Sequence, residues 1–147
     1  MLGWSVGDII ALSRLAVEVH TAYKNGPKNY RHICEEVKSL QPMINKAKHH
    51  FKSPTLTDNN RHQGQEVLSG CRSVLDDMKS LIEKYNSLGT TTNNTYQVFR
   101  KIRLGVADIG TLRARLMVNI GLLNSFIQRF DILTTTIRYG LMLISLL

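Results

Sequence analysis

Apolar residues recur at three- and four-residue intervals near the start of the chain, with charged residues between them. This spacing predicts an amphipathic helix over residues 5–24. Ser5 followed three residues later by Asp8 is typical of a capping box at a helix N-terminus. Asn25-Gly26-Pro27 should end the helix, with Gly26 in the left-handed conformation. We expect this helix to bury Ile9, Leu12, Leu15, Ala16, Val19, Ala22 and Tyr23.

The same periodicity continues over residues 27–51 and predicts a second helix. Pro42 lies inside this helix, and an interior proline removes one backbone hydrogen bond at a cost of roughly 3 kcal/mol. We therefore expect a kink or a break near Gln41. The stripe expected to be buried is Tyr30, Ile33, Cys34, Val37, Leu40, Ile44, Ala47 and Phe51.

A polar connection over residues 53–60 leads to a third helix over residues 61–88. Its apolar positions follow a near-heptad pattern, and a polar loop over residues 90–95 follows it. The expected stripe is Val67, Leu68, Cys71, Val74, Leu75, Met78, Leu81, Ile82, Tyr85 and Leu88.

The remainder of the chain predicts a short basic helix over residues 95–105 and a restart at Asp108. The long last helix would bury Ile109, Leu112, Leu116, Ile120, Leu123, Ile127 and Phe130. The apolar tail, residues 131–147, either completes this helix against the other helices or forms an adhesive end. Its branched threonines slightly disfavour helix, and GLMLISLL is too short to span a bilayer.

These patterns together predict an all-α fold, because no convincing strand pattern is present. Four main helices with short polar connections favour an up-and-down helical bundle, with the short basic helix before the last one. We expect one bundle domain over residues 1–130 and an apolar C-terminal tail over residues 131–147 that continues the last helix.

The composition adds a strong positive charge to this picture. The chain has 147 residues and a formal net charge of +8, which suits an anionic membrane surface, a nucleic acid or an acidic protein. The first helix lacks the basic start of a signal peptide and is too charged to span a membrane. We therefore expect a cytoplasmic protein that associates peripherally with a membrane or remains in solution.

The sequence contains no recognisable catalytic constellation, so we expect a non-enzymatic protein with no cofactor and no small-molecule substrate. There is no phosphate-binding glycine loop and no nucleophile or zinc motif. His49 and His50 are adjacent and point apart on a helix, so a solvated basic end is favoured over a metal site. Cys34 and Cys71 occupy apolar positions, which favours buried free thiols over one disulfide.

Two features carry a binding hypothesis beside a structural one. The basic residues Arg100, Lys101, Arg103, Arg113 and Arg115 gather near the start of the last helix. They are either a solvated face or a surface for anionic lipid or nucleic acid. Trp4 precedes the first helix and either packs onto it as a hydrophobic staple or anchors at a membrane interface.

Several segments, taken in order, resemble the fungal N-terminal domain of STAND (NLR-like) proteins, a group related to the HeLo-like domains. The resemblance covers roughly residues 3–130. It rests on SVGDIIAL at 5–12, GPKNYR at 26–31, SVLDDM at 73–78 and DIGTLRARLMVNIGLLN at 108–124. It implies a helical signalling or effector module without enzymatic activity. In the HeLo-like branch such a bundle is associated with membrane targeting and regulated cell death.

In that branch the N-terminal helix is the membrane-active part. On this sequence it corresponds to Trp4, Val6, Ile9, Ile10, Leu12 and Leu15. The chain departs from the family in carrying Pro42, and Arg14 and Glu18 make its first helix less apolar than that of an evident pore-former. No nucleotide-binding motor or repeat array accompanies the segment, which is consistent with a stand-alone member, a truncated product or a fragment.

Three hypotheses of function therefore remain open. The first is an interaction module, with protein partners or self-association, whose first helix reaches a membrane. The second is a basic nucleic-acid-binding bundle, for which no recognisable module supports the assignment. The third is a dimerisation domain in which the near-heptad stripes continue across a partner.

Overall fold

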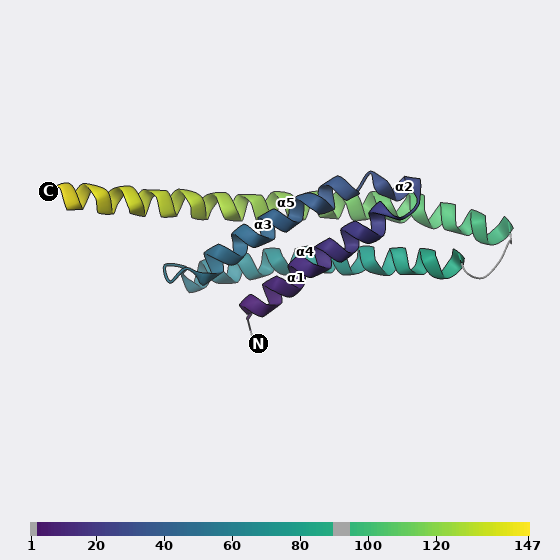
Figure 1. The fold of residues 1–147 in the computed structure, drawn as a ribbon, viewed down its shortest axis with the longest axis horizontal. Helices are drawn as coiled ribbons and strands as arrows, with labels where there is room; N and C mark the ends of the chain where they lie inside the picture. The colour runs from purple at the N-terminus through teal and green to yellow at the C-terminus, as the bar shows by residue number, and fades with distance from the viewer. Residues whose placement is uncertain (1–2, 90–94) are drawn as a thin grey trace.

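The computed structural model describes residues 3–89 and 95–147, with the backbone alone for residues 29, 88–89, 95–107 and 134. Within these residues the chain is helical throughout, apart from short connections (Figure 1). The helices are α1 (Val6–Lys24), α2 (Lys28–Arg31), α3 (Cys34–Lys52), α4 (Asp58–Gly89) and α5 (Thr95–Leu146). The all-α prediction is thus confirmed at the level of four long helices, with α2 as a short addition.

The start of α1 follows the local sequence closely. The Ser5 hydroxyl accepts a hydrogen bond from the Asp8 backbone N–H, and the Asp8 carboxylate accepts one from the Ser5 backbone N–H. This is the predicted capping box. The helix end differs from the prediction, because no described glycine has a positive φ angle. The Asn25 N–H instead closes the last turn on the Thr21 carbonyl.

Gly26 is placed by close packing rather than by a left-handed conformation. A Cβ atom there would lie 3.2 Å from the Ala22 carbonyl oxygen and 3.3 Å from the Ile82 Cδ1 atom. Both distances are shorter than ordinary van der Waals contact. The glycine therefore allows the end of α1 to approach α4.

The second predicted helix is divided, but not where the proline predicts. The break falls at His32 and Ile33, between α2 and α3, and α3 continues without interruption through Pro42. Pro42 and Lys38 both lie on the exposed face. Water can therefore bind the Lys38 carbonyl that the proline leaves without its helical partner, which lowers the cost of the missing bond.

The predicted restart at Asp108 is wrong, since α5 runs as one helix from Thr95 to Leu146. The separate short basic helix before it is therefore not observed. A glycine inside a helix costs only about 1 kcal/mol relative to alanine, and Gly105 does not interrupt this one. In the tail, the Thr135 and Thr136 hydroxyls donate to the carbonyls of Asp131 and Ile132.

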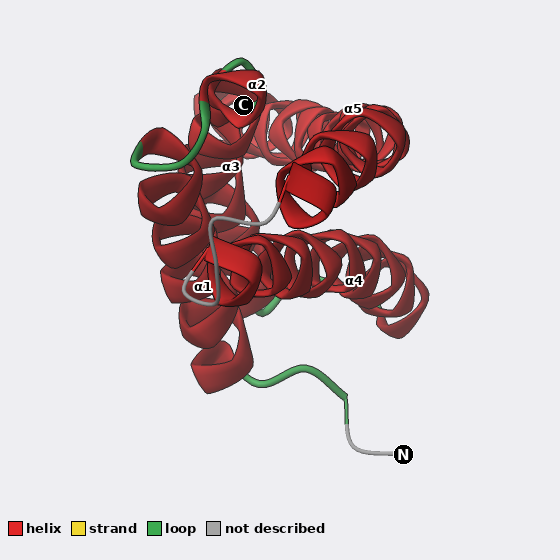
Figure 2. Cartoon of the chain, turned by 90° about the vertical axis from the view of Figure 1, so that its right-hand side faces the viewer, coloured by secondary structure: helices red, strands yellow, loops and turns green. Residues whose placement is uncertain are grey.

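Figure 2 shows the long helices nearly end on, arranged around one another. Their buried side chains form one core. Helix α1 packs on α3 and α4, and α5 packs on the same two helices. In Figure 1, α1 and α4 run in one direction, whereas α3 and α5 run in the other. The C-terminal part of α5, yellow in Figure 1, extends well beyond the other helices.

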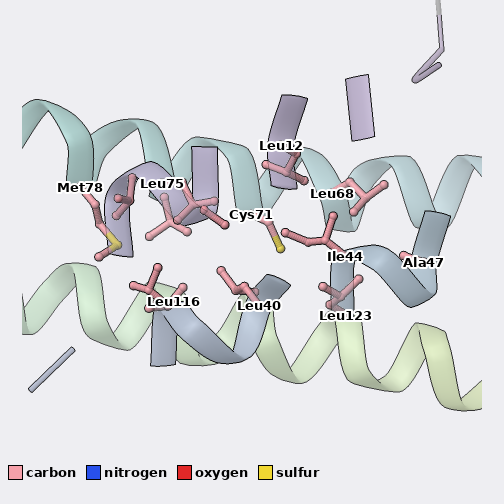
Figure 3. Packing of buried hydrophobic residues seen from close by; sticks show 14 of the residues in the cluster. Leu12, Leu40, Ile44, Ala47, Leu68, Cys71, Leu75, Met78, Leu116 and Leu123 are labelled. Atoms are coloured by element: carbon pink, nitrogen blue, oxygen red, sulfur yellow. The ribbon is translucent and has the colours of Figure 1, made fainter. Parts of the chain in front are cut away.

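The core is formed mainly by the predicted stripes (Figure 3). Some of the residues expected in them are only partly buried, namely Leu15, Ala22, Val67, Tyr85 and Ile120. The side chain of Leu88 lies outside the described residues. Apart from the tyrosines, no residue with a charged or polar side chain is buried among the described residues. Leu56 and Phe126 are buried although the sequence pattern did not place them in a stripe. Leucine, isoleucine and sulfur-containing side chains fill the centre, among them Leu12, Leu40, Ile44, Leu68, Cys71, Leu75, Met78, Leu116 and Leu123.

Candidate interaction surfaces

The residues expected to be membrane-active are divided between the core and the surface. Ile9 and Leu12 are fully buried, and Leu15 and Trp4 are half-buried against the core. Val6 is also half-buried, whereas Ile10 is exposed. The apolar stripe of α1 thus points into the bundle, and only its outer edge is accessible.

Polar contacts attach α1 to α4 along its length. The Trp4 indole N–H donates to the Ser69 hydroxyl at 3.0 Å. In the middle of the helix, the Lys79 Nζ lies 3.0 Å from a Glu18 carboxylate oxygen. Hydrogen bonding to this carboxylate, which is the main cause, raises the pKa of Lys79.

Near the other end of α1, the Tyr23 hydroxyl donates to the Met78 carbonyl at 2.7 Å inside the core. Burial, the largest cause, raises the pKa of Tyr23 well above its ordinary value. The hydrogen bond from Trp4 to Ser69 and the one from Tyr23 to Met78 thus attach both ends of the α1 region to α4.

The predicted basic surface is only partly described. The side chains of Arg100, Lys101 and Arg103 lie outside the described residues. Arg113 forms an ion pair with Glu36 of α3, at 2.6 Å from Nη2 to Oε1, and its Nε donates to the same oxygen at 2.8 Å. Arg115 pairs with Asp77 of α4 at 2.6 Å. Both arginines therefore connect α5 to its neighbours, which weakens their attraction for an external anion.

An open groove of about 340 Å3 lies between α4 and α5, beside the Arg115–Asp77 pair. Asp77 and Asp108 line it together with Lys84 and Arg115. Two acidic and two basic side chains leave the groove without a dominant charge. It therefore does not favour an anionic ligand.

A second, smaller pocket of about 230 Å3 between α1 and α3 is strongly basic, and the sequence analysis did not identify it. It is lined by His20, Lys24, Arg31, Cys34, Glu35 and Lys38. These residues come from three helices and are scattered in sequence, so no local pattern marks them. Burial, the largest cause, raises the pKa of the Cys34 thiol, which is opposite to the lowered pKa of a reactive thiolate.

Among the side chains that the structure describes, most of the exposed large apolar ones belong to the C-terminal part of α5. Its exposed side chains are Ile132, Leu133, Ile137, Tyr139, Leu141, Met142, Leu143, Ile144, Leu146 and Leu147. The tail therefore does continue the last helix, but it does not pack against the other helices. The sequence left open whether the tail packs against the other helices or forms an adhesive end. In the structure the tail does not pack against them and is exposed.

The described residues contain no group of three or more histidine, cysteine, aspartate or glutamate side chains placed to hold a metal ion. Of the two neighbouring histidines, His50 lies 3.1 Å from Asp131, across α3 and α5. Cys34 and Cys71 are both buried and unbonded. Among the described helices, none is both long and apolar enough to cross a bilayer.

Comparison with known protein families, curated proteins and solved structures finds no match to this chain.

Proposed function

We propose that this chain is a non-enzymatic signalling and interaction module, built on an up-and-down helical bundle, whose first helix is the effector segment. This is the role implied by the resemblance to the N-terminal domains of fungal NLR-like receptors, including its link to regulated cell death. In the proposed mechanism α1 leaves the bundle and inserts its apolar stripe at an anionic membrane surface.

The observation that carries this proposal is the position of α1. The helix packs on α3 and α4, while the α3–α5 and α4–α5 contacts do not involve it. Its departure would remove none of the α3–α5 and α4–α5 contacts directly, but it would expose the side chains of α3 and α4 that face α1 in the core. Its buried stripe includes Ile9, Leu12 and Val19, and burying each such side chain in lipid recovers about 1.5–3 kcal/mol.

Charge near α1 supports an anionic surface as the target. The basic pocket contributes His20 and Lys24 from α1 and Lys38 from α3. A lysine or arginine near an anionic membrane contributes about 1 kcal/mol of attraction. Nucleic acid is the weaker alternative, because Arg113 and Arg115 are already paired with acidic side chains.

The test is release of a dye from vesicles of phosphatidylserine and phosphatidylcholine by the full chain, with and without a covalent lock on α1. Glu18→Cys and Lys79→Cys, joined by a short bismaleimide, tie α1 to α4 at an existing ion pair. The matched control joins Asp77→Cys to Arg115→Cys, which ties α4 to α5 at another ion pair and leaves α1 free.

The proposal predicts dye release by the unmodified chain and by the α4–α5 lock, and none by the α1 lock. Since Cys34 and Cys71 are buried, the reagent should react with the introduced thiols. Equal release by both locked proteins, or no release by the unmodified chain, would exclude α1 as the effector segment.

A further inference from the structure

The C-terminal part of α5 continues the core stripe of the bundle beyond the point where the other helices end. Leu116, Leu123 and Phe130 follow one another at seven-residue spacing and are buried, with Phe130 8% exposed. The next two positions in this series are Ile137 and Ile144, which are 48% and 69% exposed. The stripe is thus the same on both sides of Phe130, but its partners are present on one side only.

Contacts to the bundle end at the same place. The last described polar contacts between α5 and its neighbours join Arg129 to Gln63 and Asp131 to His50. Beyond them, the described side-chain hydrogen bonds of α5 are made within the helix itself, by Thr135, Thr136 and Ser145. About 15 residues, or roughly 22 Å of helix at 1.5 Å per residue, therefore extend without tertiary support.

The apolar area exposed over all faces of this segment exceeds the largest apolar patch of a typical monomer. The large apolar side chains from Ile132 to Leu147 are between half and fully exposed. At roughly 100 Å2 of apolar area for each fully exposed side chain, they present about 700 Å2. The largest apolar patch on a typical monomer is about 300–600 Å2, whereas a stable interface buries about 800 Å2 on each partner.

Charge indicates how two copies could meet. The chain as a whole carries +8, but residues 131–147 contain only Asp131 and Arg138 as charged residues, so this segment is neutral. An antiparallel pair would place the two basic bundles at opposite ends of the paired segment. A parallel pair would hold them side by side, where their charges repel.

The middle of the segment is suited to close approach. Gly140 lies midway between Leu133 and Leu147, and a Cβ atom there would meet no other heavy atom within 4 Å. In an antiparallel pair centred on Gly140, the absence of a side chain lets the two backbones come close. Ile137 of one copy then lies near Ile144 of the other.

We propose that residues 132–147 form a self-association surface that takes the same segment of a second copy of this chain in antiparallel pairing. The inference rests on the interaction role proposed above, but it does not depend on release of α1. The two can therefore fail separately: a protein that associates without releasing dye supports this inference and contradicts the membrane step.

The first test is the molar mass of the full chain, measured by sedimentation equilibrium over micromolar concentrations. We expect a dimer of the 16.7 kDa chain. The informative pair is Ile144→Lys and Ser145→Lys, which place the same charge at neighbouring exposed positions, on and off the stripe. Ile144→Lys should weaken association by about tenfold or more, while Ser145→Lys should leave it nearly unchanged.

A monomer at every concentration would overturn the proposal, as would equal effects of the two lysines. If the chain is monomeric but Ile144→Lys abolishes its binding to neutral phosphatidylcholine vesicles, a membrane surface is the occupant and the second copy is excluded. Neither substitution touches the bundle, so loss of the fold does not complicate the result.

Disulfide formation tests the orientation. Ile137→Cys and Ile144→Cys are prepared as separate proteins and oxidised alone and as a mixture. Antiparallel pairing predicts a mixed disulfide between the two variants and little linkage in either variant alone. Efficient linkage of each variant with itself would indicate a parallel pair and contradict the proposed arrangement.

Discussion

Gly64 offers a sharp test of the packing between α3, α4 and α5. A Cβ atom at this buried position would lie 2.6 Å from the Phe126 Cζ atom and 2.7 Å from the Phe51 Cζ atom. Ordinary contact begins near 3.4 Å. In the Gly64→Ala variant, the rings of both phenylalanines must therefore move apart by a large part of an ångström. These rings already contact each other, with centroids 6.0 Å apart.

The magnitude follows from two opposing terms. Alanine is favoured over glycine inside a helix by about 1 kcal/mol. Overpacking a filled core costs typically about 1–3 kcal/mol. Gly121 is exposed in α5 and has open space at its Cβ position. Its replacement by alanine therefore changes helix propensity without overpacking and serves as the control. Gly121→Ala should thus stabilise the fold by about 0.5–1 kcal/mol, whereas Gly64→Ala should destabilise it by about 1 kcal/mol.

The assay is urea unfolding followed by circular dichroism, at a protein concentration below that of association. The difference between the two variants in free energy of unfolding isolates the steric term, because the helix-propensity term is common to both. The reasoning predicts a difference of about 1–3 kcal/mol. Equal stabilisation by both alanines would show that α4 does not approach the two phenylalanine rings as closely as described.

Three further predictions concern individual side chains. Tyr23→Phe removes the buried hydrogen bond to the Met78 carbonyl and should lower the free energy of unfolding by about 1 kcal/mol. Tyr30→Phe should be neutral or stabilising, because the buried Tyr30 hydroxyl has no partner among the described residues. The urea midpoints of the two variants test this difference. Hydrogen bonds from Ser5 lower the pKa of Asp8 below its ordinary 3.8. The carboxylate therefore stabilises the fold above pH 3.8, and this contribution is lost as the pH falls through the lowered pKa. Asp8→Asn should lose less stability on acidification, measured by unfolding at neutral pH and below 3.8. Burial raises the pKa of Cys71 from 9.0 to about 12. The free energy of unfolding should therefore fall as the pH rises above 9.0, where only the unfolded chain releases the thiol proton. In Cys71→Ala the free energy of unfolding should fall less steeply over the same pH range.

The elements and the core were largely predictable because both depend on local spacing. A helix repeats every 3.6 residues, so the positions of Ile9, Val37 and Leu75 along their own segments are enough to place them inside. The capping box was predictable for the same reason, since Ser5 and Asp8 are three residues apart. The pattern did not predict the burial of Leu56, which lies in a polar connection and is buried only through tertiary packing.

Interruptions were harder to predict, because their cost depends on what surrounds them. Pro42 does not break α3, since its exposed position leaves the affected carbonyl accessible to water. Gly26 does not adopt a left-handed conformation. The glycine is instead explained by the close approach of Ile82, which leaves little room for a side chain. Neither circumstance can be read from the neighbouring residues.

The candidate surfaces divide in the same way. The pairing of Arg113 with Glu36 joins residues 77 positions apart, so a basic cluster in the sequence gave no indication of its acidic partner. The basic pocket at Lys24, Arg31 and Lys38 likewise depends on the packing of three helices. The apolar tail was visible in the sequence, but only the end of the bundle near Phe130 shows that the stripe continues without a partner.

Self-association through the C-terminal part of α5 can be measured by hydrogen–deuterium exchange of the amides over residues 133–146. A helix without tertiary contacts is marginal in water and exchanges quickly. If this segment pairs with a second copy, its amides become protected as protein concentration rises. Ile144→Lys should then remove the protection, while Ser145→Lys should not. Fast exchange at every concentration, beside a well-protected bundle, would contradict self-association through this segment.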